Sequence, residues 1–101
     1  MKPFYIKQGD TKPSLYTTLT EEGVAVDLTG ATVRFHMGDV VDALAVIVMA
    51  EMGAVRYDWV AADTLMAGSY RAEFEATFPD GSPETFPNDT AIGVIIMEVE
   101  A

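Results

Sequence analysis

Glu73 and Glu75 are the first residues of this 101-residue chain whose types and spacing suggest chemistry. The residues from 70 to 78 alternate between apolar and polar, which predicts a β-strand with both glutamates on its polar face. Two residues along a strand separate the backbones by about 7 Å, a spacing found between the paired carboxylates of inverting glycosidases. Any exposed acidic strand gives this spacing, and no pocket is evident that would raise the pKa of one carboxyl. We therefore expect no catalytic residues.

Histidine and aspartate give two further possibilities for chemistry. His36 is the only histidine and there is no cysteine, so a histidine-based metal site or catalytic triad lacks the neighbours it needs. Carboxylates in or near loops could bind calcium, but the EF-hand spacing is absent, and Asx-turns or caps explain the same residues. These aspartates are Asp10, Asp27, Asp39, Asp42 and Asp63. We expect no metal site and no cofactor, while the loop carboxylates leave a bound cation open.

Tyr57 and Trp59 fall on one face of a predicted strand and form an aromatic pair. Such a pair can stack on a sugar, although packing in a hydrophobic core is its commoner role. We favour the core, and the same alternation assigns further residues to it. The predicted core residues are Leu28, Val33, Phe35, Tyr57, Trp59, Tyr70, Phe74 and Phe78.

The elements that would position these side chains are short strands separated by turn signals. Strand-like segments recur every ~8–12 residues, which is typical of an all-β sandwich or small barrel, and no βαβ alternation predicts a parallel sheet. The segments are 4–7, 15–19, 24–28, 31–37, 55–59, 70–78, 84–86 and 91–99. A turn at residues 21–23 is of the hairpin type, and residues 61–67 form a corner or a single helical turn. Asp63 and Gly68-Ser69-Tyr70 resemble the tyrosine corner of immunoglobulin-like domains, where a Tyr hydroxyl bonds to nearby backbone. We therefore predict an immunoglobulin-like antiparallel β-sandwich of about seven to nine short strands, in one domain spanning residues 1–101.

Two segments are apolar on both faces. Residues 43–50 leave no polar side; their β-branched content favours a strand, while Asp39 as a cap keeps a short helix open. In the final strand, Ile92, Val94 and Ile96 share one face and Ile95, Met97 and Val99 share the other. Because a sandwich has one core layer, a surplus apolar face must be covered by a loop or by another chain. The candidate interface residues are Val46, Ile47, Val48, Ile92, Val94 and Ile96.

The formal net charge is −10, and no Lys or Arg follows Arg71. This balance argues against a nucleic-acid partner, which demands clustered basic residues, and it favours either a solvated acidic face or docking to a basic neighbour. No apolar signal-peptide region follows Met1, and the longest apolar run, 43–50, is far shorter than the about 20 residues that span a bilayer. We therefore expect neither nucleic acid nor membrane as a partner.

A series of short motifs resembles the immunoglobulin-like N-terminal domain of tailed-phage baseplate upper proteins and related prophage virion proteins. The matching stretches are 4–15 (FYIKQGDTKPSL), 26–35 (VDLTGATVRF), 53–59 (GAVRYDW), 63–64 with 68–74 (GSYRAEF), and 80–81 with 85–88 (TFPN). The resemblance covers nearly the whole chain in order, and it implies an all-β virion module that attaches to other structural proteins. In that family a long extension carrying receptor-binding proteins follows the domain, whereas this sequence stops at Ala101. We therefore expect a small accessory protein of the neck, tail, baseplate or head.

These observations lead to three functional hypotheses. The first is a non-enzymatic structural protein of a bacteriophage virion, assembled in the host cytoplasm in several copies or as a homo-oligomer. It would act by protein–protein docking to the capsid, connector or tail. The second is a carbohydrate-binding adhesion module, which requires an exposed Trp59 or Tyr16. The third, a glycan hydrolase using Glu73 and Glu75, is the one we least expect.

Overall fold

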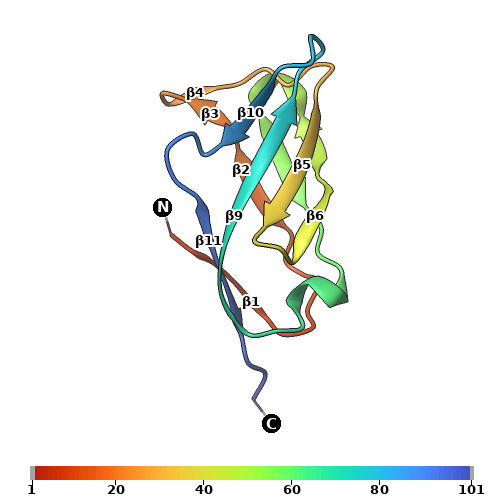
Figure 1. The fold of residues 1–101 in the computed structure, drawn as a ribbon, viewed down its shortest axis with the longest axis vertical. Helices are drawn as coiled ribbons and strands as arrows, with labels where there is room; N and C mark the ends of the chain where they lie inside the picture. The colour runs from red at the N-terminus through yellow and green to blue at the C-terminus, as the bar shows by residue number, and fades with distance from the viewer. Residues whose placement is uncertain (1, 101) are drawn as a thin grey trace.

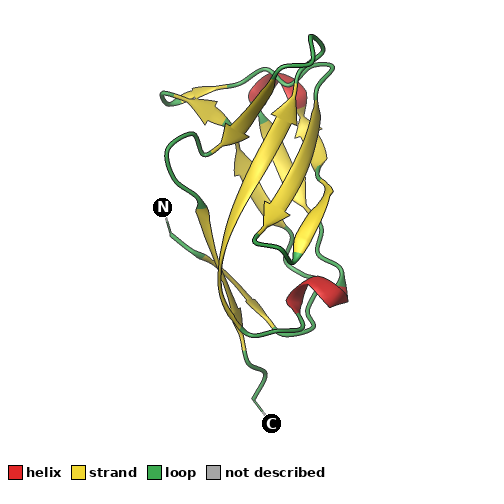
Figure 2. Cartoon of the chain, in the orientation of Figure 1, coloured by secondary structure: helices red, strands yellow, loops and turns green. Residues whose placement is uncertain are grey.

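The computed structural model describes residues 2–100, which form two facing β-sheets with a small hairpin beside them (Figures 1 and 2). The strands are β1 (Phe4–Lys7), β2 (Leu15–Thr18), β3 (Thr20–Glu21), β4 (Val24–Ala25), β5 (Thr32–Met37), β6 (Val41–Leu44), β7 (Val46–Met49), β8 (Ala54–Tyr57), β9 (Gly68–Thr77), β10 (Pro83–Phe86) and β11 (Ile92–Met97). Two 3₁₀ helices, η1 (Ala50–Met52) and η2 (Ala61–Thr64), lie between them. The larger sheet has the order β1–β11–β9–β5–β6 with β10 also beside β9, the smaller has the order β2–β8–β7, and β3 pairs with β4.

The chain crosses between the sheets in the manner of an immunoglobulin-like sandwich. After β2 in the smaller sheet it forms β5 and β6 in the larger one, returns for β7 and β8, and crosses again for β9, β10 and β11. The tyrosine corner predicted from the sequence is present, because the Tyr70 hydroxyl donates a hydrogen bond of 2.6 Å to the Met66 carbonyl. The all-β sandwich prediction is therefore confirmed.

One strand pair departs from the predicted antiparallel arrangement, since β1 and β11 run parallel, with Phe4 opposite Val94 and Lys7 opposite Met97. Among the described residues the other strand pairs are antiparallel. Two parallel strands need a crossover connection, which is usually an α-helix and can then be recognised in the sequence. Here the connection is almost the whole sandwich, so no local pattern in the sequence marks it.

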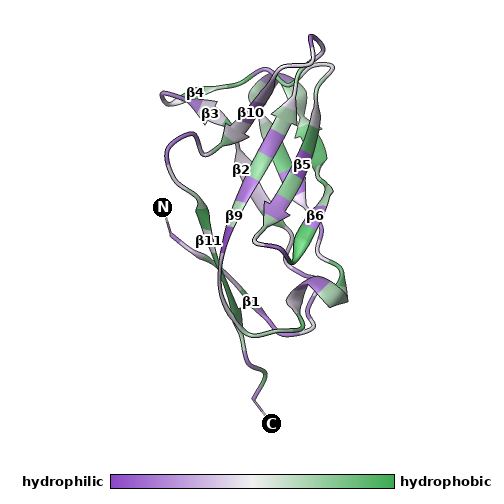
Figure 3. Cartoon of the chain, in the orientation of Figure 1, coloured by the Kyte–Doolittle hydropathy of each residue, from purple (hydrophilic) through white to green (hydrophobic). Residues whose placement is uncertain are grey.

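Strand β9 has the alternation that its sequence predicts, with Ala72, Phe74 and Ala76 fully buried and Glu73 and Glu75 facing outward. The alternating colours along β9 and β5 in Figure 3 show the same two-residue period. One edge of β9 pairs with β5, while its other edge pairs first with β11 and then with β10. Residues 87–91 interrupt this second edge, and they lie outside the strands.

The core is organised around Phe35, whose ring lies 4.3 Å from that of Tyr57 and 5.0 Å from that of Phe74, measured between centroids. Six of the eight predicted core residues are fully buried, and Tyr70 and Phe78 pack against them while half-buried. The aromatic stacking adds to the burial of apolar area in fixing how the two sheets pack. The six fully buried residues are Leu28, Val33, Phe35, Tyr57, Trp59 and Phe74.

The apolar segment 43–50 is extended up to Met49, so the helical alternative is wrong there, but the segment is not a single strand. It contains the end of β6 in the larger sheet and all of β7 in the smaller one. Ala45 lies at the crossing, where its N–H donates a hydrogen bond of 2.8 Å to the Val33 carbonyl. The division of this segment, together with the short strand β3, raises the strand count of the described residues to eleven.

Replacing Tyr70 with Phe tests the tyrosine corner. Tyr70→Phe removes the hydroxyl that bonds to the Met66 carbonyl, and we expect a loss of about 1 kcal/mol in the free energy of unfolding by urea denaturation. Tyr5→Phe is the matched control, because the Tyr5 side chain is exposed and its loss of a hydroxyl should change stability by less than about 0.5 kcal/mol. Equal effects of the two substitutions would contradict a stabilising role for the corner.

Candidate docking surfaces

The final strand β11 does not supply the contact face that the sequence predicted. Ile92, Val94 and Ile96 are 4%, 0% and 2% exposed, so they belong to the core of the sandwich and are unavailable to a partner. The reason is that β11 lies inside the larger sheet, between β1 and β9, with this face toward the smaller sheet. On the opposite face Ile95 is half-buried, and Tyr5 and Ser69 flank it on the neighbouring strands.

Strand β7 does present apolar side chains to solvent. Val46 and Val48 are 37% and 46% exposed, whereas Ile47 between them packs against the core. Of the three interface residues predicted here, Val46 and Val48 therefore point outward and Ile47 points inward. Met49 at the end of the strand is also exposed, and the sequence reasoning did not single it out.

The outer face of the smaller sheet extends this apolar surface to its far edge. Tyr16 and Val46 each lie directly opposite Arg56 on β8, so the three residues form a row across the sheet. Tyr16 is 65% exposed, and Arg56 donates a hydrogen bond of 2.9 Å to Asp58, which also accepts one from Ser14. We call Tyr16, Val46, Val48 and Met49 the β7 face. No other element of the described chain packs on this surface. Its neighbour Arg56 is already paired with Asp58.

Glu75 and His36 belong to a network of polar contacts on the outer face of the larger sheet, and Glu73 lies opposite His36 in the strand register. His36 Nε2 lies 3.5 Å from Glu75 Oε1, and His36 Nδ1 lies 3.4 Å from Asp42 Oδ1. Arg34 donates a hydrogen bond of 2.9 Å to the same Asp42 oxygen, and this bond holds the pKa of Asp42 below its usual value. These side chains are exposed or half-buried, and neither groove described below is lined by them.

Two of the predicted loop aspartates, Asp27 and Asp63, satisfy local hydrogen bonds in the way that the alternative of Asx-turns and caps describes, whereas Asp42 lies in strand β6. Asp27 accepts bonds of 2.9 Å and 2.6 Å from the backbone N–H and the hydroxyl of Thr29, which lower its pKa. Asp63 accepts bonds of 2.6 Å from the Tyr57 hydroxyl and 3.0 Å from the Val60 N–H. Within residues 2–100, no group of three His, Cys, Asp or Glu side chains is placed to hold a metal ion.

Tyr57 and Trp59 are both in the core, as predicted. Trp59 is 4% exposed, its ring lies 5.5 Å from that of Phe35, and within the described chain its Nε1 is the one buried side-chain polar atom without a hydrogen-bond partner. Burial and the bond to Asp63 together raise the pKa of Tyr57 far above its usual value. The aromatic pair therefore stabilises the sandwich and offers no platform for a sugar ring.

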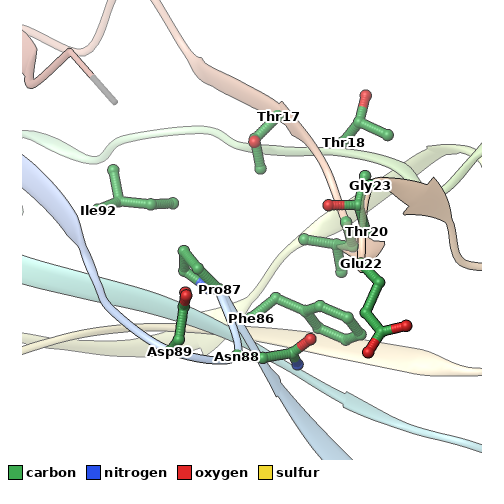
Figure 4. A pocket seen from close by; sticks show the side chains of 11 residues that line it. Thr17, Thr18, Thr20, Glu22, Gly23, Phe86, Pro87, Asn88, Asp89 and Ile92 are labelled. Carbon is green, nitrogen blue, oxygen red and sulfur yellow. The ribbon is translucent and has the colours of Figure 1, made fainter.

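A groove that the sequence reasoning missed runs between the edge of the smaller sheet and residues 87–92. Figure 4 shows Thr17 and Thr18 on one side of it and Phe86, Pro87, Asn88 and Asp89 on the other. Its volume is about 350 Å³, and a second hollow of about 290 Å³ adjoins it, since Thr17 and Ile92 line both. The signal in the sequence is Pro87-Asn88-Asp89, which lies between the predicted strands 84–86 and 91–99 and by itself indicates only a loop.

No protein-family model and no curated protein sequence matches this chain. No helix among residues 2–100 is long and apolar enough to cross a membrane. The fold and the surfaces define a small immunoglobulin-like β-sandwich whose exposed features are an apolar sheet face and an edge groove.

The buried Tyr57 hydroxyl makes stability depend on pH in the alkaline range. Its folded pKa is raised, so its contribution is fully present below the unfolded pKa of about 10 and is lost as pH rises above that value. We expect the stability difference between the native chain and Tyr57→Phe to shrink between about pH 9 and about pH 11, measured by urea denaturation. A constant difference for Tyr57→Phe would contradict the assignment.

Proposed function

We propose that this chain is a non-enzymatic structural protein of a tailed bacteriophage particle, which acts by docking to other virion proteins. The series of motifs that resembles baseplate upper proteins supports the virion assignment, and the immunoglobulin-like sandwich agrees with the fold that this resemblance implies. The chain would occupy the neck, tail, baseplate or head in several copies. Its localisation would be the virion, after assembly in the host cytoplasm.

The single observation that carries the docking mechanism is the β7 face. Tyr16, Val46, Val48 and Met49 gather on the outer side of a three-stranded sheet, and nothing in the described chain covers them. Exposed apolar surface of this kind marks interaction sites, and an aromatic residue beside aliphatic ones is typical of an interface centre. The acidic surface, with 16 Asp and Glu against 6 Lys and Arg, would steer docking toward a basic partner.

The residues with catalytic potential support a non-enzymatic role. His36 lies within 3.5 Å of both Glu75 and Asp42, and the Tyr57 hydroxyl donates a hydrogen bond to Asp63 beneath the surface. Each of these side chains thus contacts another side chain of the same protein. Neither groove is lined by any of these residues.

Replacing Val46 and Val48 together with Asp tests the β7 face. Two charges placed on a surface that becomes buried in the particle should reduce incorporation by about tenfold or more, measured as copies per purified particle. Val60→Asp is the control, since Val60 is exposed outside the face and its substitution should leave incorporation unchanged. Normal incorporation of a folded double variant would exclude the β7 face as the docking surface.

A carbohydrate-binding module is the alternative, and only Tyr16 favours it, because Trp59 is buried. If the core position of Trp59 is correct, its fluorescence should resist acrylamide quenching and remain unchanged when glycans are added. A change in fluorescence on adding glycans, lost in the Tyr16→Ala variant, would favour carbohydrate binding over protein docking.

A further inference from the structure

The outer edge of β2 carries backbone groups that no strand of the described chain satisfies. β2 is the edge strand of the smaller sheet and pairs with β8 alone, with Tyr16 opposite Arg56 and Thr18 opposite Ala54. In the same register, the Leu19 N–H donates a hydrogen bond of 2.8 Å to the Gly53 carbonyl. Hydrogen-bonded pairs alternate along an antiparallel ladder, so the N–H and C=O groups of Tyr16 and Thr18 point away from β8. They form a template for a further strand.

The groove lies directly beside this edge and has an apolar floor. Leu19, Phe86 and Ile92 line it, and all three are fully buried side chains at the margin of the core. The adjoining hollow continues the groove past Tyr16 toward Phe4, so the groove follows β2 along its length. An extended segment laid here would pair with β2 and direct alternate side chains toward the floor. The groove therefore fits a strand better than a helix or a compact ligand.

The charge of the residues that line the groove indicates which charge the bound segment should carry. Glu22 and Asp89 line the first hollow, where no Lys or Arg of the described chain is found, whereas Lys2 lines the adjoining hollow. The acidic rim of this site is therefore confined to the first hollow. Outside the lining, Glu84 raises the pKa of Glu21, which precedes Glu22 in the chain, through a side-chain hydrogen bond and then like-charge repulsion. A cationic neighbour would relieve this repulsion. A second copy of the chain, with its net charge of −10, would increase it.

We propose that the free edge of β2 binds an extended segment of a partner protein by strand addition, and that this segment alternates apolar residues with lysine or arginine. Main-chain hydrogen bonds to Tyr16 and Thr18 would supply affinity, and the apolar floor and acidic rim would supply specificity. This inference rests on the proposed docking function and names a second surface for it, which shares Tyr16 with the β7 face but includes neither Val46 nor Val48.

The direct test uses a nine-residue peptide that alternates valine with lysine, added to the isotope-labelled chain and followed by nuclear magnetic resonance. We expect the Tyr16 and Thr18 amide signals to shift, their hydrogen exchange to slow, and the binding to weaken as salt is added. A peptide alternating valine with glutamate, and a lysine peptide with every second amide methylated, should not bind. The proposal is overturned if the lysine peptide does not bind, or binds without affecting these two amides.

Thr18→Pro isolates the hydrogen bonds of the edge. Proline removes an N–H that points away from β8, so we expect a folded protein that binds the peptide about tenfold more weakly or worse. Leu44→Pro is the matched control on the free edge of β6, where the Ala45 bond to Val33 implies that the Leu44 N–H also points outward. This control should bind the peptide normally. Equal affinity for Thr18→Pro and the native chain would overturn the proposal.

The acidic rim gives a second test that does not alter the backbone. Glu22→Gln combined with Asp89→Asn should weaken binding of the lysine peptide about tenfold and reduce its dependence on salt. If Thr18→Pro fails to fold, this variant decides the question, because unchanged affinity contradicts the charge argument. Shifts of Tyr16 and Thr18 with protein concentration alone would assign the edge to a second copy and overturn the basic partner. The peptide experiments use the purified chain and no phage particle. Failure of peptide binding would therefore overturn the β2 proposal without bearing on Val46 and Val48. Normal incorporation of the Val46 and Val48 double variant would likewise exclude the β7 face without bearing on the edge of β2.

Discussion

Pairing of β9 along both of its edges is the constraint on which the rest of the structure depends. This ten-residue strand bonds to β5 on one side and to β10 and β11 in succession on the other. Its inward residues Ala72, Phe74 and Ala76 face the smaller sheet, and Phe74 packs against Phe35 at the centre of the aromatic cluster. Because β10 and β11 share one edge, the chain between them must leave the sheet. The loop 87–91 and the groove beside it follow from this sharing.

Much of the fold could be predicted because its strands carry a local signal. The alternation of residues 70–78 identifies β9 and its buried face, and β1 was predicted with its observed ends. The turn at residues 21–23 agrees with a two-residue hairpin loop, in which Glu22 and Gly23 adopt φ values of 48° and 82°. The Tyr70 hydrogen bond also depends on neighbours only four residues away.

What could not be predicted depends on contacts between distant parts of the chain. A strand that is apolar on both faces does not reveal which face is inward, so Ile92, Val94 and Ile96 were assigned to a partner when their own sandwich buries them. The run from 43 to 50 likewise gives no sign of its passage between sheets at Ala45. The groove combines β2 with residues more than 60 positions away, and hydrophobic periodicity carries no information about such a pairing.

The parallel ribbon of β1 and β11 has a mechanical consequence. Phe4 begins the ribbon at one end and Met97 finishes it at the other. Both strands lie in the lower half of the molecule in Figure 1. Tension applied at these two residues acts along the strand direction, so the evenly spaced hydrogen bonds between them share the load in shear instead of opening one after another. A protein built in this way resists being pulled apart lengthwise more than it resists being peeled from the side.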